Sequence, residues 1–78
     1  MSEKEIFGWL KIDSYRKIVE TIETTSKSAK EISQLTHMTI RDVGEALESL
    51  ERNKVLMHTS NGWKATESGI KVLNKFFR

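Results

Sequence analysis

The 78-residue chain has no cysteine and no proline, and each absence excludes something. Without cysteine there is neither a disulfide framework nor a thiolate metal site to brace the fold. Without proline, helices can run with no forced break. A chain of this length forms one small domain, near the lower limit for a self-sufficient core. We therefore expect any extra stabilisation to come from a partner surface, such as a second copy of the chain.

Long apolar runs are also absent. No stretch approaches the ~20 residues that a membrane helix needs. The first ten residues, MSEKEIFGWL, carry acids and lack the apolar run of a signal peptide. With 31% charged and 37% hydrophobic residues, the composition is typical of a soluble globular domain rather than a disordered chain. These features predict a cytoplasmic protein with no membrane partner.

Residue sets that carry catalysis or bind metals are not visible either. His37 and His58 have no ligand partners at metal spacing. There is no Ser/His/Asp or Cys/His set and no glycine-rich phosphate loop. Nothing supplies a nucleophile with its base, so the sequence predicts neither an enzyme nor a cofactor, metal or small-molecule site.

Charge is nearly balanced overall but unevenly distributed. The formal net charge is +2. Residues 55–78 carry four Lys and Arg against one acid, whereas residues 39–54 carry three against four. Such an uneven distribution says more about an anionic partner than the total charge does.

Four segments show the apolar periodicity of helices. The first covers residues 14–24, and Asp13 or Ser14 can cap its start. The second is about two turns long and begins at Ser28, which forms a capping box with Glu31. The third and fourth begin after threonine N-caps at positions 39 and 66. An earlier apolar segment, residues 6–12, could be a strand or a helical turn.

Apolar stripes on the second and third helices predict which side chains are buried. They comprise Ala29, Ile32 and Leu35 in the second helix and Ile40, Val43, Leu47 and Leu50 in the third. Gly44 lies at the edge of the third-helix stripe and costs ~1 kcal/mol there relative to alanine. Close approach of another helix is a plausible reason for it. Asp42 is placed to complete a weaker capping box with Thr39.

The segment 55–66, VLMHTSNGWKAT, predicts a β-hairpin in an otherwise helical chain. Asn61-Gly62 is typical of a type I′ turn, with residues 55–60 before it and residues 63–65 returning. Trp63 is expected to pack on the domain. Two strands alone are marginal in water, so the hairpin should pair with something else.

The order helix, helix, turn, helix, hairpin resembles that of the small winged helix-turn-helix regulators, the compact single-domain type of archaea and their viruses. The motifs AKEISQL, ALESLERNKVL and KATESG are similar to the family's pattern, over roughly residues 14–73. Asn53 and Lys54 stand where glycine is usual, and Asn53 can supply the left-handed cap. Ala65 stands where leucine is usual.

The resemblance implies an α+β, mainly α, fold in a single winged-helix domain. Its parts are a short N-terminal apolar segment (1–13), a core of three helices and a hairpin wing (14–66), and a C-terminal helix (67–78). It also implies a short strand near residues 26–28 that pairs with the wing.

The resemblance further implies a transcriptional regulator that binds double-stranded DNA. The third helix would enter the major groove, and the wing would lie on the backbone or minor groove. Arg41 is the best base reader, because its fork matches guanine O6 and N7. The DNA-binding residues carried over are His37, Thr39, Arg41, Asp42 and Glu45, with Ser28 and Lys30 before them and His58, Ser60, Asn61 and Lys64 in the wing.

The acids of the third helix leave an alternative interpretation open. Its outer face carries Asp42, Glu45 and Glu48 against Arg41 and Arg52. Acids can accept from cytosine N4, but a strong non-specific DNA binder is not built this way. The alternative is a winged-helix protein–protein interaction module without strong DNA binding.

Apolar residues at the two ends of the chain predict a homodimer. The C-terminal helix is apolar on two sides, and one side should seek a partner by two-fold symmetry. The alternative is that the N-terminal segment folds back and covers this helix within one chain. The predicted interface is Ile6, Phe7, Trp9, Leu10, Ile70, Leu73, Phe76 and Phe77.

Overall fold

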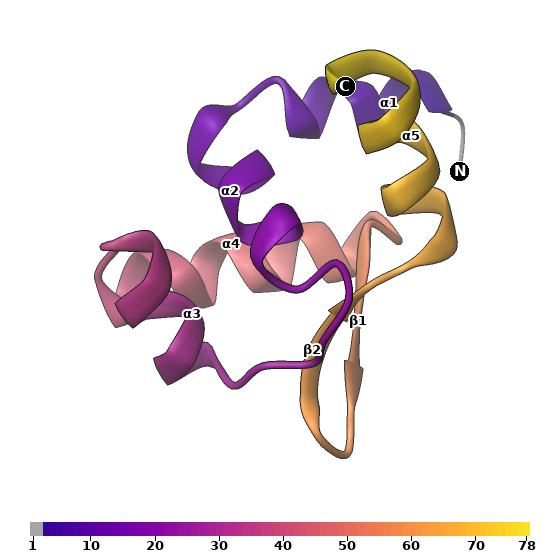
Figure 1. The fold of residues 1–78 in the computed structure, drawn as a ribbon. Coiled ribbons are helices and arrows are strands. Elements are labelled where there is room, and N and C mark those ends of the chain that lie inside the picture. The colour runs from indigo at the N-terminus through magenta and orange to yellow at the C-terminus, as the bar shows by residue number, and fades with distance from the viewer. Residues whose placement is uncertain (1–2) are drawn as a thin grey trace.

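The computed structural model describes residues 3–78, which form helices and one hairpin (Figure 1). The elements in chain order are α1 (Glu3–Leu10), α2 (Asp13–Thr21), α3 (Ala29–Thr36), α4 (Ile40–Arg52), β1 (Leu56–Thr59), β2 (Gly62–Ala65) and α5 (Glu67–Phe77). The predicted α+β class, mainly helical, is confirmed. The early apolar segment is helical and forms most of α1. None of the helices in the described part of the chain is long and apolar enough to span a membrane.

Three helices begin at the caps that the sequence predicts. At α3, the Glu31 amide donates to Ser28 Oγ over 3.2 Å, and the Ser28 amide donates to Glu31 Oε1 over 3.0 Å. Thr66 accepts from the Gly69 amide at the start of α5. These bonds satisfy amides that have no partner inside the helix, and so they fix where each helix begins.

Two other capping predictions are wrong. Thr39 accepts from the Asp42 amide at the start of α4, but the Asp42 side chain does not complete a capping box. Helix α2 follows Ile12, which makes no side-chain cap bond. Asp13 lies inside the helix instead, where its carboxylate accepts from Arg16 over 2.8 Å. A contact with a side chain one turn later therefore replaces the predicted cap.

The end of α4 is closed by Lys54, not by Asn53 as predicted. Asn53 has a φ of −98°, whereas Lys54 has a φ of 63° and takes the left-handed conformation. The Val55 amide donates to Leu50 O over 2.9 Å and the Lys54 amide to Glu51 O over 3.0 Å. This bond pair is the Schellman motif, in which the left-handed residue follows the C-cap. The cap therefore falls one residue later than the sequence suggests.

The hairpin turn is also shifted by one residue. Thr59 pairs with Gly62 across the strands, so Ser60 and Asn61 form the turn. Neither has a positive φ; the positive value, 122°, belongs to Gly62. Thr59 Oγ1 accepts from the Asn61 amide and donates to Gly62 O, which holds the turn in this register. The predicted type I′ turn at Asn61-Gly62 is therefore wrong, although the hairpin is confirmed.

The segment before α3 pairs with the hairpin, as the family resemblance implies. Lys27 and Trp63 form an antiparallel bridge, with Lys27 N donating to Trp63 O over 3.0 Å and Trp63 N donating to Lys27 O over 2.7 Å. The Ala65 amide donates to Ile22 O. A Cβ on Gly62 would lie 2.5 Å from Lys27 O. Glycine is thus required at position 62 by both its φ and the close approach of this segment.

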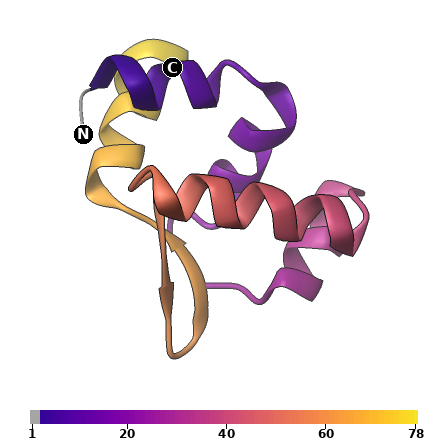
Figure 2. The ribbon, with the colours of Figure 1, turned by 180° about the vertical axis from the view of Figure 1, so that it is seen from behind.

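A single apolar core joins all five helices described here to the hairpin. Its fully buried members include Ile6 and Leu10 from α1, and Val72 and Leu73 from α5. Trp63 is partly buried against this core, as expected. Helices α1 and α5 lie side by side at the end of the molecule opposite the hairpin tip (Figures 1 and 2).

Two predicted core residues and one predicted helix contact are corrected by the structure. Leu35 is 58% exposed and Ile40 is 56% exposed. Both lie close to the turn between α3 and α4. Gly44 is exposed, and a Cβ there would meet nothing within 4 Å. No helix within the described residues approaches Gly44, so internal packing does not explain it.

Candidate nucleic-acid interface

Helix α4 is the centre of the candidate site. Figure 2 shows it running across the molecule, with α3 at its N-terminal end and the hairpin projecting beside its C-terminal end. The connection from α3 turns sharply at His37, which has a left-handed φ of 61°. Ser33 Oγ donates to Met38 O over 2.6 Å and holds this turn. The first turn of α4 is thereby presented at an exposed corner.

Arg41 has the freest guanidinium of the described chain. Its side chain is 87% exposed, and its one ionic contact joins Nε to Glu45 Oε1 at 3.8 Å. The terminal nitrogens of Arg16, Arg52 and Arg78 all donate hydrogen bonds. Among residues 3–78, Arg41 is the one arginine whose terminal nitrogens make none. The two terminal nitrogens of Arg41 are therefore available to donate parallel hydrogen bonds to two acceptors that lie in one plane.

The rest of the exposed α4 face is acidic and partly self-paired. Arg52 donates to Glu48 Oε1 over 3.2 Å, one helical turn away. Such exposed pairs contribute only about 0.3–0.5 kcal/mol each. The charged residues of the helix are Arg41, Asp42, Glu45, Glu48, Glu51 and Arg52, all exposed. Acids outnumber cations on this face, which disfavours tight, sequence-independent binding of a polyanion.

The hairpin contributes a stacked ring pair and one free lysine. The rings of His58 and Trp63 are 4.2 Å apart between centroids and nearly parallel, at 13°. Lys64 pairs with Met57 in the strand register, and both are exposed. The turn residues Ser60 and Asn61 are exposed as well. The hairpin therefore offers one cation and several hydrogen-bonding groups to a partner.

The start of α3 is more constrained than expected. The Ser28 amide is occupied by Glu31 Oε1, so it is not free for a phosphate. This bond, together with the Ser28 side chain, lowers the pKa of Glu31. Lys27, just before the helix, donates from Nζ to Thr21 O over 2.9 Å. Lys30 is exposed and remains the available cation at this end.

All eleven predicted DNA-binding residues are exposed. They fall into three groups: the start of α3, the turn with the first turns of α4, and the hairpin. Side chains of different groups make no hydrogen bond or ion pair with one another within residues 3–78. The sequence missed Lys54, which is also exposed and sits where α4 meets the hairpin. The signal that could have identified Lys54 was a charged residue at a position where the winged-helix pattern usually has glycine.

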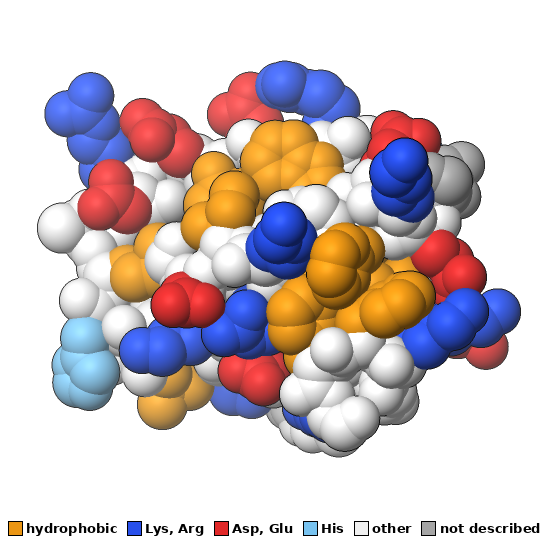
Figure 3. All heavy atoms as spheres, turned by 90° about the horizontal axis from the view of Figure 1, so that it is seen from above, with side chains coloured by type: hydrophobic (Ala, Val, Ile, Leu, Met, Phe, Trp, Pro, Cys, Tyr) orange, Lys and Arg blue, Asp and Glu red, His pale blue; other side chains and the backbone are white. Residues whose placement is uncertain are grey.

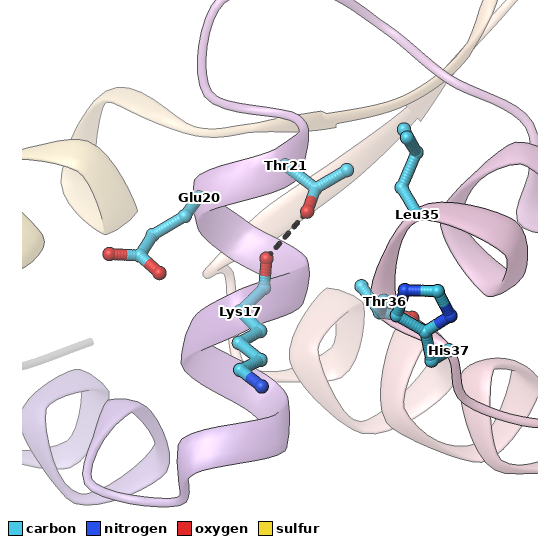
Figure 4. A pocket seen from close by; sticks show the side chains of 6 residues that line it. All are labelled: Lys17, Glu20, Thr21, Leu35, Thr36 and His37. Carbon is cyan, nitrogen blue, oxygen red and sulfur yellow. Dashed lines mark hydrogen bonds between the residues drawn. The ribbon is translucent and has the colours of Figure 1, made fainter.

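A small open pocket lies beside this region, between α2 and the end of α3 (Figure 4). Its volume is about 270 Å³ and Thr21 Oγ1 donates to Lys17 O at its wall. Leu35 is its only apolar side chain. Ligand sites are usually larger and mostly apolar. The lining residues are Lys17, Glu20, Thr21, Leu35, Thr36 and His37.

The predicted dimer interface is largely covered within one chain. Ile6, Leu10 and Leu73 are buried in the chain's own core, so their assignment to an interface is wrong. The reason is that α1 folds back onto α5, the alternative left open by the sequence. Phe7, Trp9, Ile70 and Phe77 are partly buried, and Phe76 is 47% exposed. Figure 3 shows the hydrophobic side chains that remain visible at this end.

Comparison with known proteins adds no assignment to this geometry. No family model, no curated protein and no solved structure matches the chain. No group of three or more His, Asp or Glu among residues 3–78 is arranged to hold a metal ion. The function has to be inferred from the exposed residues themselves.

Proposed function

We propose that the chain is a winged helix-turn-helix protein that binds double-stranded DNA. Helices α3 and α4 form the helix-turn-helix unit, and the hairpin is the wing. The observation that carries the proposal is Arg41, an exposed arginine with unbonded terminal nitrogens on the first turn of α4. An α-helix fits the major groove, where arginine can donate two parallel hydrogen bonds to guanine O6 and N7.

The flanking cations fit contacts to the DNA backbone. Lys30, Lys54 and Lys64 are exposed on or beside the elements around α4, and none of them makes an ion pair within residues 3–78. Lysine is a compact charge that suits a phosphate oxygen rather than a base edge. With so few cations and an acidic α4, non-specific affinity should be low and most of the discrimination should come from base contacts.

The test is a fluorescence-anisotropy titration of a labelled random duplex at several salt concentrations. Binding should weaken steeply with salt because phosphate contacts release counterions. Lys64→Ala should weaken binding to all sequences and flatten the log–log salt slope by about one unit. Lys11→Ala is the matched control, because Lys11 is exposed and directly follows α1, which lies at the end of the molecule opposite the hairpin tip (Figure 1). Absence of binding at low salt, with the helical signal intact, contradicts the proposal.

The second candidate function is a winged-helix module for protein interaction. The observation that favours it is the exposed pair Leu35 and Ile40 beside an acidic helix face, because apolar residues rimmed by charge are typical of protein interfaces. A failed DNA titration would favour this function. The surface to test would then be the acidic face of α4, with a basic partner.

A further inference from the structure

We infer that the DNA half-site contains a guanine bound by Arg41 and, one or two base pairs away, a cytosine whose N4 amino group donates to Glu45. This inference rests on the proposed function, because it assumes that α4 lies in the major groove. It assigns Glu45 a role in sequence discrimination rather than in helix stability alone.

The geometry of the pair leaves both side chains free to reach outward. Arg41 and Glu45 are one helical turn apart on the same face, and they are 87% and 68% exposed. Glu45 lies on the Nε side of the guanidinium, at 3.8 Å, so it can orient Arg41 without occupying its terminal nitrogens. A carboxylate in that position holds the donor fork facing outward, where a guanine edge would meet it.

The spacing of the pair matches the spacing of bases. Side chains at i and i+4 have Cβ atoms about 5–6 Å apart. Base pairs are stacked about 3.4 Å apart, so the two side chains can address pairs one or two steps apart. A helix lying obliquely in the groove spans either separation.

A carboxylate discriminates among base edges by repulsion as well as attraction. In the major groove, guanine offers only acceptors, and thymine offers an acceptor and a methyl group. Cytosine offers the N4 donor with no acceptor of its own beside it. Glu45 has no proton to donate, so acceptor-rich edges at its position are disfavoured. Adenine also offers a donor at N6, but its N7 acceptor lies beside that donor, so cytosine is the base that satisfies Glu45 best.

The other acids of α4 are placed less well for this role. Asp42 lies three residues after the N-cap Thr39 and is offset around the helix from Arg41 by about one residue's rotation, ~100°. Glu48 already accepts a hydrogen bond from Arg52 over 3.2 Å. Glu48 therefore provides a matched control: an exposed glutamate on the same helix, with its own arginine partner.

The test is selection of bound duplexes from a randomised library, followed by sequencing, for the wild type, Glu45→Gln and Glu48→Gln. Wild type should enrich sites with a fixed guanine and a nearby fixed cytosine. Glutamine pairs with adenine through N6 and N7, so Glu45→Gln should change that cytosine to adenine and leave the guanine. The change in preference should be roughly 5- to 150-fold, the usual cost of one mismatched pair.

The outcomes separate this inference from the proposed function. If no sequence is enriched by any variant and no duplex binds at low salt, the proposed function fails. If the wild type enriches a site but Glu45→Gln keeps the same base preferences, the assignment of Glu45 is overturned while DNA binding stands. Glu48→Gln should tighten binding to all duplexes without altering base preference. An equal cytosine-to-adenine change with Glu48→Gln also overturns the assignment. Circular dichroism confirms that both exposed substitutions leave the fold intact.

Discussion

The end of the molecule formed by α1 and α5 and the corner formed by α3 and α4 are built differently. At the α1–α5 end, contacts join residues far apart in the chain. Lys75 donates to Glu3 over 3.1 Å, and the rings of Phe7 and Phe77 are 5.4 Å apart. Arg16 lies over the Phe77 ring at 5.0 Å. Several cations and aromatic rings at this end are therefore engaged within the chain.

At the α3–α4 corner, the same kinds of residue are left unengaged. The Arg41 and Glu45 contact is local, and Leu35 and Ile40 are exposed. Helix α4 also contains a glycine that no internal contact requires. A non-glycine residue in the left-handed conformation flanks each end of α4: His37 precedes the helix and Lys54 follows it. This conformation is unfavourable for a residue with a Cβ. The α1–α5 end is thus joined by long-range contacts, whereas the α3–α4 corner leaves apolar and charged side chains exposed.

The largest expected effect comes from the same substitution made in both regions. Leu10→Ala removes a fully buried side chain that holds α1 in the core, and should lower the free energy of unfolding by about 2–5 kcal/mol. Leu35→Ala removes an exposed side chain and should change the free energy of unfolding by no more than about 0.5 kcal/mol. Urea unfolding followed by circular dichroism measures both. Equal losses would mean that the α3–α4 corner is packed after all.

A pair of glycine substitutions gives effects of opposite sign. Gly44→Ala should raise the free energy of unfolding by about 1 kcal/mol, because alanine is the better helix former and its Cβ has open space. Gly69→Ala should lower it by about 1–3 kcal/mol, since a Cβ there would lie 2.4 Å from Val55 O. Thermal unfolding of the two variants side by side gives the comparison. A destabilised Gly44→Ala variant would show that position 44 has an internal constraint.

The left-handed Lys54 gives a smaller and more specific effect. Lys54→Gly relieves the strained φ and should raise the free energy of unfolding by about 0.5–1 kcal/mol. Lys54→Ala keeps the strain and removes the charge, so it should give no such gain. Both variants should bind DNA more weakly if the side chain contacts a phosphate. Stability gained without any loss of binding would assign Lys54 no role at the interface.

The smallest effect is a pH dependence at the α1–α5 end. Hydrogen bonds from Arg78 lower the pKa of Glu23 below its ordinary value of 4.5. Protonating the carboxylate therefore opposes folding, so this contribution is complete above pH 4.5 and is lost as the pH falls through the lowered pKa. Arg78→Ala should remove this part of the acid dependence, as midpoint temperatures between pH 3 and 6 would show. A variant with an unchanged acid profile would contradict the pairing.

The sequence predicts element types well because those signals are local. The caps at Ser28, Thr39 and Thr66 each depend on a side chain within three residues of the amide that it satisfies. The pairing of the segment near Lys27 with the hairpin was implied by the resemblance rather than by local pattern. The α+β class could nevertheless be predicted, because the capping and turn residues act on near neighbours in the chain.

The errors arise where tertiary context chooses between near-equivalent local options. Asn53 and Lys54 are adjacent candidates for the left-handed position, and the burial of Val55 in the Schellman motif selects the second. Thr59 moves the hairpin turn one residue toward the N-terminus through bonds of its own side chain. Periodicity placed Leu35 and Ile40 on apolar faces, but it cannot tell whether another element reaches that face. At the candidate site, the residue types were visible, whereas the free fork of Arg41 required the structure.

The pairing of Lys27 with Trp63 has a consequence for how the hairpin fluctuates. Strand β2 is bonded on both sides, to β1 and to the segment before α3, whereas β1 pairs with no strand other than β2 among residues 3–78. The Trp63 and Ala65 amides point to Lys27 O and Ile22 O, so they can meet solvent only when the hairpin separates from the segment between α2 and α3. Amide hydrogen exchange should therefore be slow at these two positions and fast at the hairpin tip. The base of the hairpin should therefore open only together with its contacts to the helical core, whereas the tip should open independently.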